Sequence, residues 1–198
     1  MTKIKICGLT RPEDIEAVNQ YKPDYIGFVF AKNSRRFITA KQAADLKKQL
    51  LDDIMAVGVF VNEAKDVIAD LLIHDIIDAA QLHGNETESE IRWIKTQTGK
   101  QVIKAVSVQS RSDPVRWSGS QADYLLLDHG AGGTGKTFDW NLITDCGKPF
   151  FLAGGINIQN LSRALSKGAY GIDISGGVET DGKKDTKKKA AVIEAVRG

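Results

Sequence analysis

Short apolar segments alternate with longer amphipathic segments eight times along the chain. Apolar runs of this length, rich in β-branched residues, are typical of buried parallel strands, and the amphipathic stretches are typical of the helices that cover them. The pattern predicts strands over Lys3 to Cys7, Tyr25 to Phe30, Ile54 to Val61, Ala79 to Leu82, Val102 to Val108, Tyr124 to Asp128, Phe150 to Ala153 and Gly171 to Ser175. The chain is therefore predicted to be an α/β protein built from successive βα units.

Several of the intervening segments carry signals for the start of a helix. Thr39 and Thr87 are expected N-caps for AKQAADLKKQL and ESEIRWIKTQTG, and Thr10 is expected to start the first helix before Pro12. The segment SRSDPVRWSGS after the fifth strand is the weakest helix, and FDWNLITDCG after the sixth is short and poor.

Eight units in 198 residues give about 25 residues per unit, close to the lower limit for a closed (β/α)8 barrel, or TIM barrel, which usually has about 250 residues. The prediction is a minimal single-domain barrel over residues 1–198, since no Pro- or Ser-rich linker divides the chain. An open doubly wound sheet uses the same local units and is the structural alternative. It ranks second because such sheets more often have five or six strands.

The composition narrows the functional classes. With 42% hydrophobic residues, 26% charged residues and a net charge of +2, the chain is typical of an ordinary soluble globular protein, and no nucleic-acid partner is expected. Charged residues are spread along the chain except for one C-terminal lysine run, which is most simply interpreted as a solvated helix face. The run comprises Lys183, Lys184, Lys187, Lys188 and Lys189.

Neither the N-terminus nor any later segment indicates a membrane protein. MTKIKICGLT lacks the apolar stretch of a signal peptide, and no segment approaches the roughly 18 uninterrupted apolar residues of a membrane span, so a cytoplasmic protein is expected. Cys7 and Cys146 are too few for a disulfide framework, and the three histidines are scattered, so no metal site is expected. The sequence leaves the oligomeric state open, with a monomer favoured over a homodimer.

Polar residues follow the predicted strands at their carboxyl ends, where barrel enzymes place their chemistry. They are Cys7-Gly8, Ser34 to Arg36, Asn62, His83-Gly84, Ser107 to Gln109, Asp128 to Gly130, Gly154-Gly155 and Ser175 to Gly177. The strand starts carry far less chemistry, so these ends form the candidate site, with His83 in a supporting role.

Two glycine-rich motifs, LAGGI and ISGGVE, follow the seventh and eighth strands. Glycines let backbone amides approach an anion closely, and this part of a barrel commonly binds phosphate. Gly154, Gly155 and Ser175 to Gly177 are therefore the predicted phosphate-binding residues. Tight turns without a ligand remain the alternative for either motif alone.

Asp128 ends the apolar run YLLLD at the mouth of the predicted barrel. Burial there would raise its pKa and let it act as a general acid, although the capping of a loop or helix is an alternative role.

Cys7 ends the run KIKIC, in which alternation places Lys5 and Cys7 on one face and the isoleucines on the other. A nearby ammonium would favour the thiolate, although a strand cysteine alone is more often inert. Because the first and eighth strands are neighbours in a closed barrel, we also expect Asp173 to pair with Lys5.

Arg36, in KNSRR, offers a forked guanidinium suited to a carboxylate. Arg35 beside it competes for this role, and at most one of the two is expected to face the mouth.

Residues 130–137, GAGGTGKT, satisfy the P-loop pattern and raise the possibility of an NTP-binding module. The position after the sixth strand and the poor following helix disfavour nucleotide binding. We interpret the segment as a glycine-rich loop beside Asp128 that closes over substrate.

Taken together, KICGLT, GFVFAKNSRR, QLHG, LLDHGAGGTGKTFDW, LAGGI and GIDISGGVE resemble the phosphoribosylanthranilate isomerase family, in the family's order across all eight strands. The resemblance also accounts for the P-loop pattern, because GGTGKTFDW is typical of this family. One departure is Gly176, where the family commonly has a second small polar residue.

The resemblance implies an Amadori rearrangement of N-(5-phosphoribosyl)anthranilate in tryptophan biosynthesis, without a cofactor. It further implies that Cys7 is the general base, that Asp128 is the general acid, and that Arg36 holds the anthranilate carboxylate. Another sugar-phosphate isomerase or epimerase on the same barrel is the nearest alternative, and it would need different groups at the other strand ends.

Overall fold

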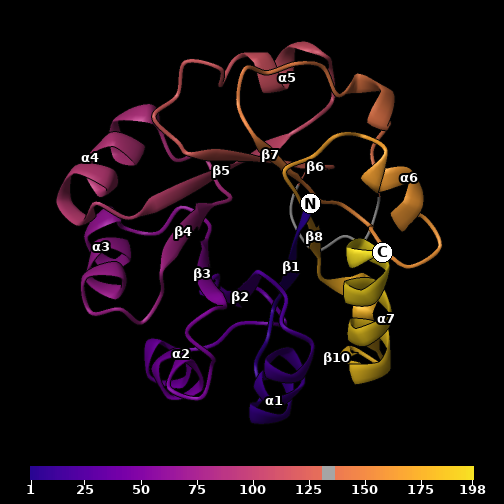
Figure 1. Ribbon diagram of the computed structural model, residues 1–198. Coiled ribbons are helices and arrows are strands. Elements are labelled where there is room, and N and C mark those ends of the chain that lie inside the picture. Colours follow the sequence, from indigo (N-terminus) through magenta and orange to yellow (C-terminus); the bar gives the residue numbers. More distant parts are fainter. Residues whose placement is uncertain (131–136) are drawn as a thin grey trace.

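The computed structural model describes residues 1–130 and 137–198. Eight parallel strands close into a barrel in chain order, with β8 hydrogen-bonded to β1 (Figure 1). The strands are β1 (Lys3–Cys7), β2 (Tyr25–Val29), β3 (Met55–Phe60), β4 (Ala79–Leu82), β5 (Gln101–Ser107), β6 (Tyr124–Asp128), β7 (Phe150–Leu152) and β8 (Gly171–Ile174). The predicted barrel is confirmed, and the open doubly wound alternative is wrong because pairing of β1 with β8 closes the sheet.

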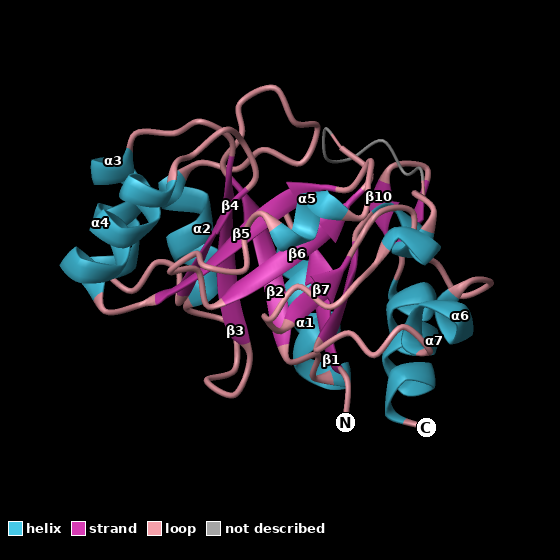
Figure 2. Ribbon diagram, turned by 90° about the horizontal axis from the view of Figure 1, so that it is seen from above, coloured by secondary structure: helices cyan, strands magenta, loops and turns pink. Residues whose placement is uncertain are grey.

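The helices lie outside the ring of strands (Figure 1). They are α1 (Pro12–Tyr21), α2 (Ala40–Lys47), α3 (Lys65–Ile73), α4 (Glu88–Thr98), α5 (Ser112–Val115), α6 (Leu161–Leu165) and α7 (Thr186–Arg197), with short 3₁₀-helices η1 (Trp140–Leu142) and η2 (Gly176–Val178). An antiparallel pair, β9 (Glu179–Thr180) and β10 (Lys183–Lys184), precedes α7. The two chain termini lie on the same side of the molecule (Figure 2).

The helix starts follow the sequence in two cases and depart from it in one. Thr39 and Thr87 are the predicted N-caps, and each hydroxyl accepts a hydrogen bond from the backbone amide three residues later as part of a capping box. The prediction for Thr10 is wrong, because Arg11 occupies the N-cap position and makes no side-chain capping bond. Pro12 starts α1 without a capping hydroxyl, since its fixed φ suits the first helical turn and it has no amide to satisfy.

Strand alternation separates the inside of the barrel from its outer layer. Ile4 and Ile6 are fully buried in the core between strands and helices, whereas Lys5 and Cys7 belong to the interior of the ring. Aromatic side chains pack inside the barrel at the ends where the strands begin, namely Tyr25, Tyr124, Phe151 and Tyr170. This end is closed by packing, so the site lies at the carboxyl ends.

The C-terminal lysine run is not one solvated face. Lys183, Lys187 and Lys188 are exposed as expected, but Lys184 and Lys189 are only 7% and 1% exposed. The prediction is wrong for these two because each has an acidic partner inside the protein. Lys184 lies on β10 and pairs with Glu179, and Lys189 on α7 pairs with Asp14 of α1.

None of the helices within residues 1–130 and 137–198 has both the length and the hydropathy that a membrane-spanning helix needs.

Candidate active site

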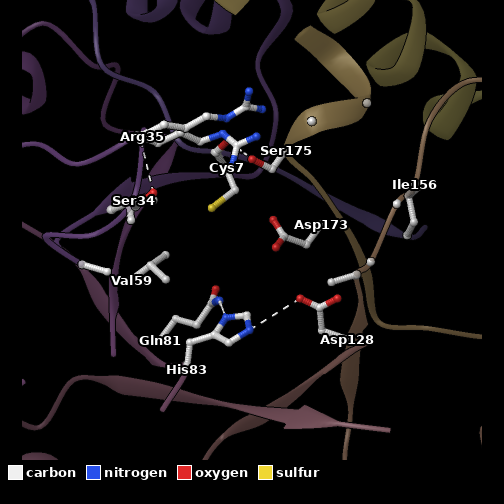
Figure 3. A pocket seen from close by; sticks show the side chains of 18 of the residues that line it. Cys7, Ser34, Arg35, Val59, Gln81, His83, Asp128, Ile156, Asp173 and Ser175 are labelled. Carbon is white, nitrogen blue, oxygen red and sulfur yellow. Dashed lines mark hydrogen bonds and ion pairs between the residues drawn. The ribbon is translucent and has the colours of Figure 1, made fainter. Parts of the chain in front are cut away.

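A pocket of about 570 Å³ opens at the carboxyl ends of the strands (Figure 3). Every predicted site residue except Lys5 lines it, namely Cys7, Arg36, His83, Asp128, Gly154, Gly155, Asp173, Ser175, Gly176 and Gly177. Lys5 is fully buried and points into the same barrel interior, one strand repeat below Cys7. The fold thus brings together side chains from the first to the last strand.

Cys7 ends β1 and presents its sulfur to this pocket (Figure 3). Its carbonyl accepts a hydrogen bond of 3.0 Å from the Oγ of Ser175, which ties the ends of β1 and β8 together. Burial raises the pKa of the Cys7 thiol, and the ammonium groups of Lys5 and Lys184 only partly offset this effect. The ammonium of Lys5 acts in the expected direction, but burial outweighs it and leaves the pKa of Cys7 raised, so the expected preference for the thiolate is not met.

The predicted pairing of Lys5 with Asp173 is confirmed. Their Nζ and Oδ1 atoms lie 3.0 Å apart, and the two residues are register partners across β1 and β8. Burial alone would lower the pKa of Lys5, but Asp173 and Cys7 outweigh it and leave the pKa raised. Lys5 is therefore a fixed positive charge directly beneath the thiol.

Asp128 ends β6 and points into the pocket from the side opposite Cys7 (Figure 3). Its Oδ1 accepts a hydrogen bond of 2.6 Å from the amide of His129, a local contact of the kind expected for a loop-capping carboxylate. Its Oδ2 lies 3.5 Å from Nε2 of His83. The capping contact uses one oxygen and leaves the other facing the pocket.

Arg36 and Arg35 both contact Glu179 but differ in exposure. Arg36 donates from Nε and Nη2 to the two carboxylate oxygens, at 2.7 and 3.0 Å, which leaves Nη1 for another acceptor. Its side chain is 10% exposed, whereas that of Arg35 is 59% exposed. The buried, oriented guanidinium of Arg36 fits a ligand carboxylate better.

Glu179 holds this cationic cluster in place. Burial would raise its pKa, but hydrogen bonds from Arg36 and Lys184 lower the pKa of Glu179 to about 2. The carboxylate is therefore ionised throughout the physiological range and orients Arg36 permanently.

The two glycine loops meet at the pocket rim. Gly154 and Gly155 adopt φ values of +83° and +64°, a region that favours glycine, and a Cβ at Gly177 would lie 2.0 Å from the carbonyl oxygen of Ile156. In the part of the chain that the structure describes, the amides of Gly154 and Gly155 donate no hydrogen bond. Free amides on closely packed loops are what an oxyanion such as phosphate requires.

Lys184 adds a positive charge beneath this rim. Its Nζ donates to the carbonyl of Ser175 at 2.9 Å and to Glu179 at 2.7 Å. At Gly176, a Cβ would lie 3.6 Å from Nη2 of Arg36, so the position has room for a small side chain. Packing therefore does not require a glycine at position 176.

Sequence reasoning missed three residues of the site, Glu179, Lys184 and Gln81. Glu179 is the last residue of the ISGGVE motif, so the motif could have indicated it. Gln81 lies two residues before His83, so strand alternation could have placed it on the same inward face. Lys184 carried no such signal, because a lysine in a charged run is normally solvated.

The P-loop hypothesis and the closing-loop interpretation both concern residues 131–136, which lie outside the described residues. Among residues 1–130 and 137–198, no group of three or more His, Cys, Asp and Glu side chains is arranged to hold a metal ion.

Comparisons of the amino-acid sequence with known proteins indicate one family. A model of the family described as N-(5'phosphoribosyl)anthranilate (PRA) isomerase matches residues 4–195. An N-(5'-phosphoribosyl)anthranilate isomerase from Endomicrobium trichonymphae is 46% identical, over 100% of this chain and 98% of the relative.

Two solved structures extend this similarity to three dimensions, each over 100% of both chains. One is a phosphoribosyl anthranilate isomerase in complex with reduced 1-(o-carboxyphenylamino)-1-deoxyribulose 5-phosphate, with 33% identity and a TM-score of 0.87. The other shows monomers generated from the dimeric isomerase of Thermotoga maritima, with 34% identity and a TM-score of 0.88. The chain therefore belongs to the N-(5'-phosphoribosyl)anthranilate isomerase family.

Proposed function

We propose that this chain catalyses the Amadori rearrangement of N-(5-phosphoribosyl)anthranilate to 1-(2-carboxyphenylamino)-1-deoxyribulose 5-phosphate, a step of tryptophan biosynthesis. The observation that carries the proposal is one pocket in which Cys7 and Asp128 face each other between an oriented arginine and the glycine loops. The ligand named for the solved relative has the carboxylate and phosphate groups that such a pocket would bind.

The two groups perform complementary proton transfers. Asp128 protonates the ring oxygen of the furanose, the C1'–O bond breaks, and the nitrogen lone pair forms a Schiff base that acidifies the C2' hydrogen. Cys7 then removes this proton, and the electrons of the C–H bond form an enolamine. Tautomerisation of the enolamine gives the ketone, so carbon 1 is reduced as carbon 2 is oxidised and no external redox partner is consumed.

Substrate orientation comes from the two anion-binding regions. Arg36 binds the anthranilate carboxylate through its free Nη1, and the loops at Gly154-Gly155 and Ser175 to Gly177 bind the phosphate. Holding both ends fixes the sugar between base and acid, which converts the two proton transfers into steps within one complex.

The chain acts as one catalytic domain over residues 1–198, as a cytoplasmic monomer. A monomer has a mass of 21.6 kDa, which light scattering after size exclusion distinguishes from a dimer. Because a relative from Thermotoga maritima is dimeric, a dimer is the outcome that would overturn this part of the proposal.

A direct assay tests the activity. Freshly made phosphoribosylanthranilate is fluorescent, and its loss on addition of the purified protein reports turnover. Cys7→Ala protein, purified in the same way, controls for contaminating isomerase. If the wild-type protein does not accelerate the loss above that control, the proposed function is wrong.

Replacing Arg36 by alanine is expected mainly to raise KM, by about tenfold or more, because a charge-assisted hydrogen bond to the substrate carboxylate is lost. Its partner Glu179 would also lose a bidentate contact, so the thermal stability of the variant is measured alongside steady-state kinetics. Arg35→Ala is the matched control, since it removes an adjacent but exposed arginine from the same carboxylate. Equal KM changes in both variants would contradict the assignment to Arg36.

The activity is also expected to depend on pH through Cys7. Only the thiolate can accept the C2' proton, and the pKa of the free thiol lies above its usual value of 9.0, so kcat/KM is expected to rise with pH through the alkaline range. Lys5→Met removes a cation that lowers this pKa and should shift the rise to still higher pH. Profiles of kcat/KM from about pH 6 to about pH 10 test this, and a wild-type plateau near neutral pH would contradict it.

A further inference from the structure

A chain of hydrogen-bonded polar side chains crosses the barrel interior at the base of the pocket, where Gln81, His83 and Asp173 line it. Nζ of Lys5 donates to Oδ1 of Asp173 at 3.0 Å and to Oε1 of Gln81 at 2.9 Å. The amide nitrogen Nε2 of Gln81 lies 3.0 Å from Nδ1 of His83. Lys5 and Gln81 are 0% and 1% exposed, so water does not compete for these hydrogen bonds.

The Lys5 ammonium determines which atom donates and which accepts in each of these hydrogen bonds. A lysine ammonium only donates, so the oxygen of the Gln81 amide must face it. The opposite orientation of the amide would place an NH₂ group against the ammonium, donor against donor. The nitrogen of Gln81 therefore faces His83, and because an amide nitrogen also only donates, Nδ1 of His83 must accept.

The state of the imidazole follows from this constraint. A ring whose Nδ1 accepts a hydrogen bond carries its proton on Nε2, and an imidazolium would place a second donor against the Gln81 amide. Nε2 is buried and makes no hydrogen bond to any residue that the structure describes. It is directed toward Oδ2 of Asp128, 3.5 Å away, across the edge of the pocket (Figure 3).

We propose that Gln81, anchored by Lys5, is a positioning residue that holds His83 as the neutral Nε2–H tautomer, so that His83 is a hydrogen-bond donor to Asp128. When Asp128 transfers its proton to the ring oxygen, its carboxylate gains negative charge, and the Nε2–H of His83 stabilises that charge. A donor already oriented in a water-poor site needs no reorganisation at this moment. This role in catalysis rests on the proposed function, whereas the tautomer itself does not.

The tautomer is measurable without substrate. Side-chain ¹⁵N chemical shifts distinguish the Nε2–H form, the Nδ1–H form and the imidazolium. The chain has three histidines, and the spectrum of His83→Gln assigns the signals of His83 by their loss. The wild-type protein at neutral pH is expected to show Nε2–H, with the shift of Nδ1 typical of an acceptor. An Nδ1–H or imidazolium form would overturn the proposal.

A near-isosteric substitution of Gln81 tests the donor-to-acceptor direction of these hydrogen bonds. In Gln81→Glu, a carboxylate can accept from both Lys5 and His83, so the proton is expected to move to Nδ1 or a second proton to be bound. The expected kinetic result is a fall in kcat of about tenfold or more with little change in KM, because the donor acts on charge that develops during reaction. An unchanged tautomer or an unchanged kcat in the folded variant would overturn the proposal.

Gln81→Met provides the matched control, since it keeps much of the side-chain volume and removes both hydrogen bonds. Here the tautomers of His83 are expected to mix, with an intermediate fall in kcat, whereas a purely structural role of Gln81 would change stability and leave the wild-type tautomer. If the wild-type protein shows the Nε2–H form but no isomerase activity, the proposed function fails and the hydrogen-bond assignment stands. If the variants do not fold, the wild-type spectrum still decides the tautomer.

Discussion

Replacing Cys7 by alanine is expected to lower kcat by about 10³-fold or more, because it removes the group that accepts the C2' proton in the proposed mechanism. The thiol makes no interaction that holds the substrate, so KM should change little. The Cys7 carbonyl, which accepts from Ser175, belongs to the backbone and is retained, so the ends of β1 and β8 stay tied together. Steady-state kinetics and thermal melting of the same preparation separate loss of chemistry from loss of fold.

Cys146→Ala is the matched control for this substitution. Cys146 is also buried and free, but its sulfur contacts the carbonyl of Lys148, away from the pocket. Deletion of that side chain is expected to reduce stability modestly and to leave kcat near the wild-type value. Turnover of Cys7→Ala close to that of Cys146→Ala would remove the base from the mechanism.

The architecture could be predicted because the hydrophobic pattern determines it locally. Each strand is a short apolar run, and alternation within KIKIC was sufficient to place Lys5 inside the barrel, where register across β1 and β8 brings it to Asp173. The boundaries shifted by about one residue, as at the end of β2, because strand ends depend on hydrogen bonds that single residues do not determine.

The electrostatics of the site could not be predicted in the same way. The charge of Lys5 was visible in the sequence, but the extent of burial around Cys7 was not, and it is burial that sets the direction of the Cys7 pKa shift. Lys184 shows the same limit. A lysine in a charged run is buried only when an acidic residue pairs with it, and Glu179, its register partner across the β9–β10 pair, does so.

The hydrogen bonds that join Lys5 to His83 through Gln81 could not be predicted from the sequence either. The side chain of Gln81 has no acid or base group. It matters because its oxygen accepts from Lys5 while its nitrogen faces His83. In the proposed mechanism, the Lys5 cation beneath Cys7 therefore also determines the hydrogen-bonding state of His83 beside Asp128. A change at Lys5 should affect both the pH profile and the tautomer of His83, which substitutions at isolated sites would not do.

Asp128→Asn is expected to lower kcat by about 10³-fold or more, because an amide cannot protonate the ring oxygen and the furanose then opens slowly. The substitution preserves shape, and the amide oxygen can still accept the hydrogen bond from the amide of His129 that Oδ1 accepts in the wild-type protein. The fold is therefore expected to be retained and KM to change little. The measurements are steady-state kinetics and near-ultraviolet circular dichroism of the folded variant.

The control lies at the other end of the same strand. Asp123 precedes β6, pairs with Lys95 and accepts a hydrogen bond from the amide of Val102, on the side of the barrel away from the pocket. Asp123→Asn removes one negative charge and keeps the backbone contact, so it should leave kcat near the wild-type value. Near-normal turnover of Asp128→Asn would transfer the role of acid to another group, and His83 would then be the first candidate because its Nε2 faces the same part of the pocket.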